Sequence, residues 1–493
     1  MTFWSKRSCE PTRRVTEHER PKVLVLGAGI AGLAAAFELS GGERPDQSIE
    51  ITVIEQSPRC GGKIASAEIA GRTIDLAADG FLARRPEALE LVAALGRTDA
   101  LRSPGASGAS IFARGKVRAM PERLSLGIPT QWRALAKSRV LTLRGLVRAG
   151  LDVVAPRHDL RGKLGDRAIG PLVAAKLGRE VVQTLVDPML GGIHAGHVSE
   201  MSASATFPQL LEVAGNSGSL MHALRATLPP SPTDGAPAKP VFNSLEGGVA
   251  SLISTLVETL TARGVTFVTE AEALGLRKDG DLFHLSTSKG EYIAEGVVVA
   301  LPAEPAARVL RDLDEELAAL LNTITYASAG VVTLVIDPDL LPKDRHGTGL
   351  LVPSTSRRRA GTAFFTTAVT YLSTKWPHVA RASDELIRVS VGKIDDVRFA
   401  SLSDDQLIRQ VLDELSELFG VVVTAREAHV TRWMNALPQY QVNHLLRVSG
   451  IEAAAERLGE VVLTGAAIGG VGIPACIGHG RKSGQRIRRS LLG

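Results

Sequence analysis

The sequence predicts an α/β fold with three parts: a discontinuous Rossmann-like nucleotide-binding domain, an α+β domain and a helical insertion domain. A glycine fingerprint at 27–32 follows the apolar run 23–26 and opens a helix-like stretch. A second helix-and-strand block lies at 252–302, and a third strand begins at 461, before a glycine-rich turn and a helix. Since parallel strands need long crossover connections, we expect these three stretches to share one sheet.

The fingerprint reads Gly27-Ala28-Gly29-Ile30-Ala31-Gly32. In a strand–turn–helix context, Gly27 permits the tight turn, Gly29 lets a pyrophosphate approach the backbone, and Gly32 lets the helix pack on the strand. The free N–H groups at the helix start then favour an anion. This pattern predicts a dinucleotide site.

An acidic residue supports the same site. Glu55 ends the next predicted strand, 51–54, where it can accept ribose hydroxyls. The polar insert 41–48 explains why the gap to Glu55 exceeds the usual spacing of about 20 residues.

Composition excludes several classes of protein. The 493 residues are enough for two or three domains, and no run approaches the ~18 apolar residues of a membrane span. The first twenty residues lack the apolar core of a secretory signal, so we expect a disordered leader. Cys9, Cys60 and Cys476 lie far apart, which suggests a reducing cytoplasm, no disulfide framework and no metal site.

Positive charge is concentrated between 101 and 170, which holds fourteen basic and four acidic residues, against a net charge of +5 for the whole chain. One interpretation is a solvated helical face. The other is contact with an anionic lipid surface or an acidic ligand. Nucleic acid is disfavoured, since aromatic residues are few and no binding module is recognisable.

The pattern along the chain predicts seven segments. They are a leader at 1–20, nucleotide-domain parts at 21–85, 241–302 and 436–493, a helical domain at 86–205, a segment with a linker at 206–240, and a substrate domain at 303–435.

Motifs along nearly the whole chain resemble the protoporphyrinogen/coproporphyrinogen oxidases of the flavin amine-oxidase superfamily. Beyond the fingerprint, they include Arg59-Cys60-Gly61-Gly62-Lys63, the run 187–196, and Gly470-Val471-Gly472-Ile473-Pro474-Ala475-Cys476. The pieces Trp376-Pro377-His378 and Arg432-Trp433 resemble the Gram-positive branch, which acts on coproporphyrinogen III.

The resemblance implies FAD as cofactor. It assigns the pyrophosphate to 27–32, the adenosine ribose to Glu55 with Gln56 beside it, and the adenine to Ala273. The remaining contacts to diphosphate, ribityl chain and flavin ring fall to Gly62, Lys63, Ala77, Ala78, Asp79, Gly80, Trp433, Gly465, Val471, Gly472 and Ile473. The family often has Gly-Pro at the positions of Ala77 and Ala78.

The implied reaction is the O₂-dependent, six-electron oxidation of coproporphyrinogen III to coproporphyrin III in haem biosynthesis, with H₂O₂ release and hydride transfer from bridge carbons to flavin N5. The cofactor supplies the hard chemistry, so no side chain is named as catalytic. Candidate substrate contacts are Gly192, His194, Leu334, Leu350, Phe364 and Lys393. For most of these positions an ordinary core or surface role is the simpler interpretation.

Several alternatives stay open. Protoporphyrinogen IX is the second substrate candidate, because arginine-rich sequence suits four propionates but also suits anionic lipid. Other interpretations are a flavin-binding scaffold that delivers porphyrin to a ferrochelatase, and a membrane-surface module. The expected location is cytoplasmic, with peripheral contact at the inner face of the cell membrane left open. The oligomeric state, monomer or homodimer, is open as well.

Overall fold

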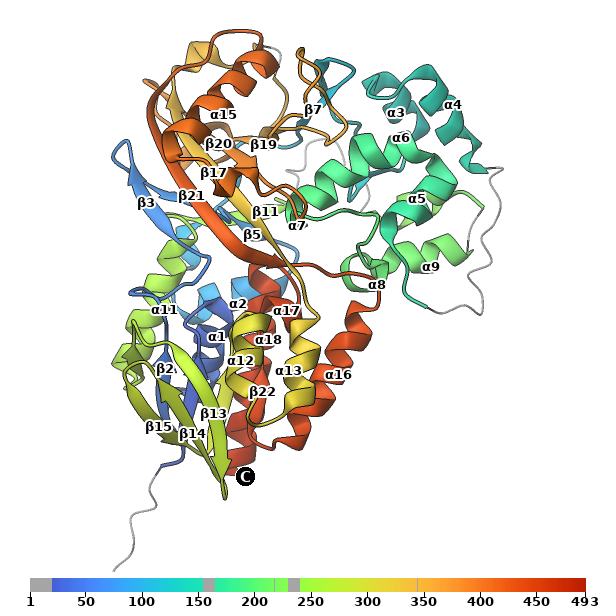
Figure 1. Ribbon diagram of the computed structural model, residues 1–493. Coiled ribbons are helices and arrows are strands. Elements are labelled where there is room, and N and C mark those ends of the chain that lie inside the picture. Colours follow the sequence, from blue (N-terminus) through green and yellow to red (C-terminus); the bar gives the residue numbers. More distant parts are fainter. Residues whose placement is uncertain (1–19, 154–164, 217, 229–239, 344) are drawn as a thin grey trace, which may run out of the picture.

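The computed structural model describes residues 20–153, 165–216, 218–228, 240–343 and 345–493. Within them the chain forms a nucleotide-type unit, a unit built on a large mixed sheet, and a helical unit (Figure 1). The expected leader, apart from Arg20, and residues 229–239, the linker part of the expected segment 206–240, lie outside the described residues.

The nucleotide-type unit contains a five-stranded parallel sheet in the order β12-β2-β1-β16-β22. Its strands come from three distant stretches of the chain, as the sequence pattern predicts. Runs of β-branched and apolar residues form them because both faces of the sheet are covered. The strands are β1 (Lys22–Leu26), β2 (Glu50–Ile54), β12 (Thr266–Val268), β16 (Gly296–Val299) and β22 (Val461–Leu463).

Alternate residues of each strand point into two hydrophobic cores on opposite faces of the sheet. Val23 and Val25 of β1 belong to the first core, and Leu24 and Leu26 belong to the second. The first core is covered by α1 (Ile30–Leu39), α2 (Pro86–Ala94), α11 (Ala250–Ala262) and α18 (Ile473–Leu492). The second is covered by α12 (Ala303–Leu310), α13 (Glu315–Asn322), α16 (His444–Arg457) and the antiparallel strands β13 (Ala273–Asp279), β14 (Leu282–Thr287) and β15 (Gly290–Ala294).

Helices α1 and α18 pack in parallel at very short range. A Cβ on Gly480 would lie 2.2 Å from the Ala31 carbonyl oxygen, and one on Gly484 would lie 2.3 Å from that of Ala35. Gly480 is therefore level with Ala31. Seven residues at about 1.5 Å each place the start of α18 roughly 10 Å before that level. The N-terminus of α18 thus extends past the start of α1, toward the other units.

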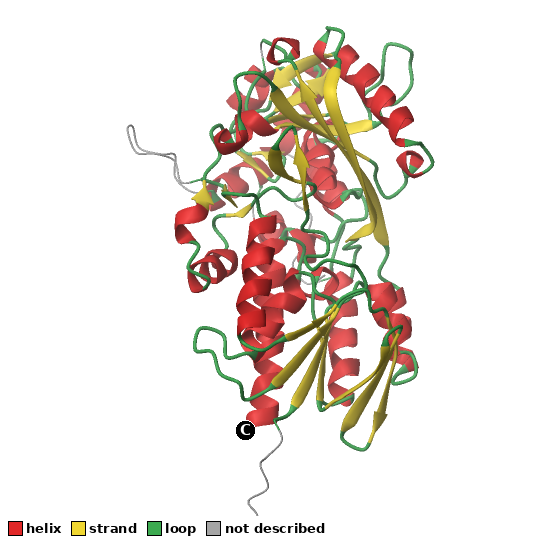
Figure 2. Ribbon diagram, turned by 90° about the vertical axis from the view of Figure 1, so that its left-hand side faces the viewer, coloured by secondary structure: helices red, strands yellow, loops and turns green. Residues whose placement is uncertain are grey.

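The second unit is a seven-stranded sheet in the order β21-β17-β20-β19-β18-β7-β8, which Figure 2 shows above the parallel sheet. The amphipathic helix α15 (Asp404–Phe419) packs on it and begins with a capping box at Ser403. The strands are β7 (Ser110–Ala113), β8 (Lys116–Ala119), β17 (Tyr326–Ile336), β18 (Gly349–Leu351), β19 (Thr366–Tyr371), β20 (Glu385–Val391) and β21 (Ala425–Pro438).

The helical unit contains a π-helix, η3 (Val182–Gly191), that includes Pro188. Proline has no N–H to donate, and a π-helical turn accommodates the lost bond. The unit's other helices are α3 (Trp132–Ser138), α4 (Leu143–Gly150), α5 (Ile169–Leu177), α6 (Arg179–Val181), α7 (Gly192–His194), α8 (Ala203–Thr206), α9 (Pro208–Asn216) and α10 (Leu220–Thr227).

Shorter elements connect the three units. They are β3 (Ser66–Ile69), β4 (Arg72–Asp75), β5 (Phe81–Leu82), β6 (Leu101–Arg102), β9 (Leu124–Ser125), β10 (Ile128–Pro129), β11 (Phe242–Leu245), α14 (Leu372–Lys375) and α17 (Ala466–Gly469).

Two stretches pack differently from the predicted division of the chain. Strands β7 and β8 lie in the segment 86–205 expected to be helical, yet β7 pairs in parallel with β18 of the large sheet. Helices α12 and α13 fall in the expected substrate segment 303–435, but they pack on the parallel sheet. The partner of β7 lies far away in the sequence, whereas α12 begins only four residues after β16 of the parallel sheet.

Candidate functional site

The three glycines of the fingerprint have different structural roles. Gly27 has a φ of +99°, and its N–H donates to the Ile54 carbonyl at 2.8 Å. A Cβ on Gly32 would lie 2.0 Å from the Gly27 carbonyl oxygen, so only glycine permits this packing. A Cβ on Gly29 would meet nothing within 4 Å. Gly29 is therefore not required by the fold, and it borders open space at the start of α1.

Backbone groups dominate this turn. Gly29 is the N-cap of α1 and makes no side-chain capping bond, so the first N–H groups of the helix are available to an anion. The side chains of Ala28, Ile30 and Ala31 are buried in the core. These three residues can meet a ligand through their main chain only.

Glu55 is held beside the turn. Its Oε2 accepts the Ala28 N–H at 2.8 Å, and its Oε1 accepts the Ser57 N–H at 2.9 Å and the Ser57 hydroxyl at 2.6 Å. A carboxylate offers about four acceptor sites, so one remains for a ribose hydroxyl. The Glu55 carbonyl accepts from Ala271, which brings Ala273 at the start of β13 close by, whereas Gln56 is exposed.

The segment after Glu55 forms the rim of the same turn. The Gly61 N–H donates to the Ala28 carbonyl at 2.8 Å, and Gly61 forms a parallel bridge with Gly29. A Cβ on Gly62 would lie 3.4 Å from the Gly29 Cα. The Lys63 ammonium lies 5.7 Å from the ring centroid of Tyr326. Gly62 and Lys63 are thus adjacent to the space above Gly29.

A second open helix start faces this region. Gly472 caps α18 without a side-chain bond, and Cβ atoms on Gly472 or Gly465 would meet nothing within 4 Å. Val471 is half-buried and Ile473 is buried. Because α18 extends past α1, the two helix N-termini lie at different depths. We refer to the open space beside Gly29, Gly465 and Gly472, where these helices begin, as the groove. This arrangement fits an extended dinucleotide better than a single phosphate.

The loop 77–80 is fixed by buried charge. The Asp79 carboxylate pairs with Lys375 and with Arg388, each at 2.8 Å, and Arg388 also donates to the Ala77 carbonyl at 2.6 Å. Burial alone would raise the pKa of Asp79, but the two cations outweigh it and lower this pKa to about 2. Sequence reasoning missed both cations, although an arginine inside the apolar strand β20 was a usable signal.

The remaining predicted flavin contacts surround that loop. Gly80 packs tightly, since its Cβ would lie 2.9 Å from both the Asn243 carbonyl oxygen and the Trp376 ring. Ala78 is exposed. Trp433 is half-buried on β21, and its indole N–H donates to the Leu76 carbonyl at 3.3 Å.

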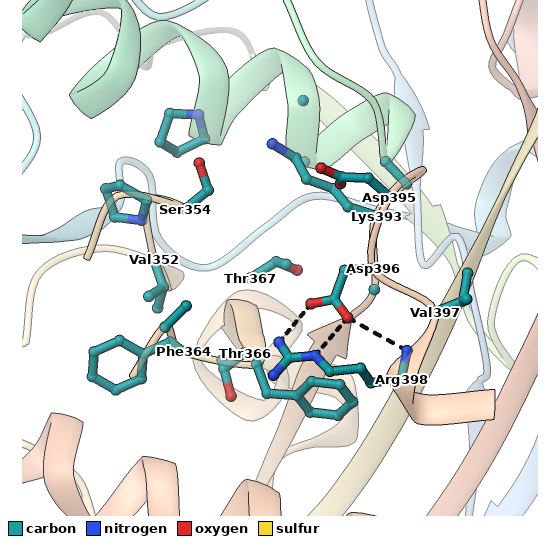
Figure 3. A pocket seen from close by; sticks show the side chains of 18 of the residues that line it. Val352, Ser354, Phe364, Thr366, Thr367, Lys393, Asp395, Asp396, Val397 and Arg398 are labelled. Atoms are coloured by element: carbon teal, nitrogen blue, oxygen red, sulfur yellow. Dashed lines mark hydrogen bonds and ion pairs between the residues drawn. The ribbon is translucent and has the colours of Figure 1, made fainter. Parts of the chain in front are cut away.

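A cavity of about 840 Å³ lies between the helical unit and the large sheet (Figure 3). Three of the predicted substrate residues, Gly192, Phe364 and Lys393, line it. Its walls are apolar on one side, at Val352, Phe364 and Phe365, and polar around Asp187, His197, Lys393, Asp395, Asp396 and Arg398. Of this polar group, only Lys393 was predicted to contact the substrate.

The other predicted substrate residues lie away from the cavity lining. Leu334 and Leu350 are fully buried in the core of the large sheet. The carbonyl of His194 accepts from the Gln439 amide at 2.8 Å, and burial lowers the pKa of its imidazole to about 4.

A short hydrogen-bonded connection joins cavity and groove. Gln439 holds α7, whose Gly192 borders the cavity, and the next residue, Tyr440, donates its hydroxyl to the Ala466 carbonyl at the start of α17. Burial raises the pKa of the Tyr440 hydroxyl and, near it, raises the pKa of the Cys476 thiol to about 11. The Tyr440 hydroxyl is the donor in this connection.

Over the described ranges, no group of three or more His, Cys, Asp or Glu side chains is arranged to hold a metal ion. Within the same ranges, no helix has the length and apolarity needed to cross a bilayer.

Comparison with known proteins supports a flavin-type cofactor. The profile of the family described as flavin containing amine oxidoreductase matches residues 30–488. This chain belongs to that family. The family and its named relatives make the chain a flavin-dependent oxidase.

The similar proteins include porphyrinogen oxidases, which confirms the predicted resemblance. Coproporphyrinogen III oxidase of Bacillus subtilis is 31% identical, with 93% of this chain and 96% of that protein covered. The Mycobacterium leprae protein of the same name is 32% identical, with 92% and 95% covered. The structure of an Exiguobacterium protein, described as a candidate protoporphyrinogen oxidase, superposes with a TM-score of 0.84 at 28% identity, covering 96% of this chain and 99% of that one.

Proposed function

We propose that the flavin is FAD, bound along the groove between the two helix starts. The adenosine end lies at Glu55 and Ala273, the diphosphate at Gly29 and the α1 N-terminus, and the ring system toward Gly472. The support is the pair of open glycines at different depths, because a mononucleotide would need only one of them. Ala78 and Trp433 border the ring in this arrangement.

We further propose that the chain oxidises coproporphyrinogen III to coproporphyrin III with O₂ and releases H₂O₂. The observation that carries this is the cavity, which falls within the ~300–1,000 Å³ of small-molecule sites and is tied to the groove through Gln439 and Tyr440. Bound flavin supplies the hydride acceptor. The names of the relatives agree with this substrate.

In this proposal the chain binds and orients the macrocycle. Val352, Phe364 and Phe365 offer apolar contact to the pyrrole rings, and Gly192 offers close backbone approach. We do not assign Lys393 to a propionate, because Asp187 already neutralises it at 2.8 Å. Arg398 is likewise paired with Asp396 at 2.6 Å, so a propionate there must compete with a carboxylate.

Anaerobic mixing of the flavin-loaded protein with each porphyrinogen tests the substrate. We expect coproporphyrinogen III to bleach the flavin, and subsequent air to give three H₂O₂ for each porphyrin formed. Bleaching by protoporphyrinogen IX alone would make the second candidate correct. No bleaching by either compound would refute porphyrinogen oxidation.

We also propose peripheral contact with an anionic membrane through α4. Leu143 and Val147 of α4 and Leu151, the residue just after it, recur at every fourth position and are 78%, 57% and 47% exposed. Trp132 is exposed beside them, and the basic side chains exposed around this face are Arg133, Lys137, Arg139 and Arg144. An apolar stripe flanked by arginine and lysine is typical of helices that lie in the lipid interface. Three other basic residues of the segment, Arg157, Arg161 and Lys163, lie outside the described residues.

Flotation with phosphatidylserine-containing vesicles tests this contact. The double variant Leu143→Glu/Val147→Glu should lower the bound fraction at least about tenfold, since each burial contributes roughly 1.5 kcal/mol or more. Leu274→Glu is the matched control, because Leu274 is similarly exposed, at 47%, on the distant strand β13. Equal binding of all three proteins, or none by the unmodified chain, would refute the proposal.

A further inference from the structure

The polar wall of the cavity contains a connected group of ionisable side chains. Asp187 sits in the π-helix immediately before Pro188, and Lys393 follows the large-sheet strand β20. Their side chains meet at 2.8 Å, and both residues are more than nine-tenths buried. π-Helical turns are rare and frequently occur at functional sites. The turn here positions Asp187 against a lysine more than two hundred residues away.

His197 extends this pair toward solvent. Its Nδ1 lies 3.3 Å from the Lys393 ammonium, and its Nε2 lies 2.9 Å from an oxygen of Asp395. The Nε2 contact has the distance of an ion pair but is not aligned as a hydrogen bond. The Asp395 side chain is 67% exposed, whereas that of His197 is 28% exposed. The group therefore runs from a buried cation to an exposed carboxylate.

Hydrogen-bond chemistry determines the imidazole tautomer. An ammonium group only donates, so His197 Nδ1 must accept from Lys393. The ring proton of neutral His197 is then on Nε2, facing Asp395. The basic nitrogen of the ring, Nδ1, therefore points at the ammonium group of Lys393, a buried residue that lines the cavity.

We propose that Lys393 and His197 form a proton relay that removes the protons lost by the substrate. The inference rests on the proposed function. In each two-electron step a bridge C–H bond breaks and its electron pair leaves with the hydride, for which bound flavin would be the acceptor. A proton also leaves, from a pyrrole N–H bond in two of the three steps and from a fourth bridge C–H bond, by way of a pyrrole nitrogen, in the third, and its electron pair stays on the macrocycle. Lys393 passes a proton to His197 Nδ1 as it takes the pyrrole proton, and His197 then releases one proton to solvent beside Asp395.

Carboxylates flank both ring nitrogens of His197. Asp187 Oδ1 lies 3.9 Å from Nδ1, and Asp395 lies at Nε2, the nitrogen from which a proton would leave toward solvent. The nearby Arg398 is neutralised by Asp396. Asp187 also accepts the Val198 N–H at 3.3 Å, which holds it in place next to His197.

The test uses the flavin-loaded protein and its His197→Ala variant under anaerobic conditions. Positioned acid–base groups typically contribute about 100-fold or more, so we expect flavin reduction by coproporphyrinogen to slow by at least about tenfold. Added imidazole should restore most of this rate, which a merely structural histidine would not show. His222→Ala on α10 is the control, since His222 is exposed and outside the cavity lining, and it should leave the rate unchanged.

The outcomes separate the relay from the proposed reaction. If neither porphyrinogen reduces the flavin of the unmodified protein, the reaction and the relay both fail. If reduction occurs but His197→Ala is as fast, or its loss is not rescued by imidazole, only the relay fails. Independently of activity, imidazole ¹⁵N NMR should show the His197 signal, identified by its absence in His197→Ala, with the proton on Nε2. A proton on Nδ1 in the resting protein would also overturn the relay.

Discussion

Two glycines three residues apart should respond to the same substitution in opposite ways. In Gly29→Ala the added methyl meets nothing within 4 Å, and the φ of −69° suits alanine. We expect stability to stay equal or rise by up to about 1 kcal/mol, because the unfolded chain loses freedom. The methyl group occupies the space proposed for the diphosphate, so flavin affinity should fall at least about tenfold, or roughly 1.4 kcal/mol.

Gly32→Ala should mainly damage the fold. Its methyl would lie 2.0 Å from a backbone oxygen, where ordinary contact begins at 3.4 Å, so α1 must move away from the turn. Overpacking of this kind costs about 3 kcal/mol, and the better helix propensity of alanine offsets about 1 kcal/mol.

Thermal unfolding of the flavin-free proteins and the flavin retained after gel filtration measure both effects. We expect Gly29→Ala to unfold at or above the temperature of the unmodified protein and to emerge with less bound flavin. Gly32→Ala should unfold several degrees lower. Full flavin retention by Gly29→Ala, or unchanged unfolding of Gly32→Ala, would refute the assignment of these two roles.

Other variants probe the buried charges and the helix contact. Asp79→Asn leaves Lys375 and Arg388 without their carboxylate and should lower the free energy of unfolding by about 3–5 kcal/mol, measured by urea denaturation. The pKa of Asp79 in the folded state, about 2, lies below its ordinary 3.8. Asp79 therefore stabilises the fold above about pH 4 by about 2 kcal/mol, and this is lost as the pH falls toward 2; the gap in unfolding free energy between unmodified and Asp79→Asn protein should narrow by about 2 kcal/mol over that range. Gly480→Ala must push α18 away from Ala31 and should cost about 1–3 kcal/mol while weakening flavin retention; unchanged values in both assays would contradict the close packing.

Local pattern was sufficient for much of the fold. The fingerprint and its flanking strand and helix follow from glycine spacing and apolar runs, and the apolar spacing of residues 404–419 is that of the amphipathic helix α15. Strands β7 and β8, a local hairpin across Arg114 and Gly115, escaped prediction, and β7 also pairs with β18, more than two hundred residues later. No local periodicity reports a partner at that distance.

The same limit decided which features of the candidate site could be predicted from the sequence. Glycine roles could be inferred because backbone geometry is local, as Gly27, Gly29 and Gly32 show. The arginine inside the apolar strand β20 signalled a buried charge, but its pairing with Asp79 and the pairing of Asp187 with Lys393 could not be inferred, since each joins residues brought together only by the fold. Lys393 was expected as an exposed lysine or a propionate partner, and it is a buried residue with a carboxylate of its own.

The glycine-lined contact between α1 and α18 has a consequence for biosynthesis. Ala35 gains its neighbour only when the ribosome has synthesised Gly484, and β22 joins the sheet's edge almost as late. The coenzyme groove therefore forms after translation of nearly all the remaining chain, whereas the large mixed sheet has its last strand by Pro438. We expect nascent chains stalled before α18 to contain an ordered mixed sheet, yet to capture no yellow cofactor.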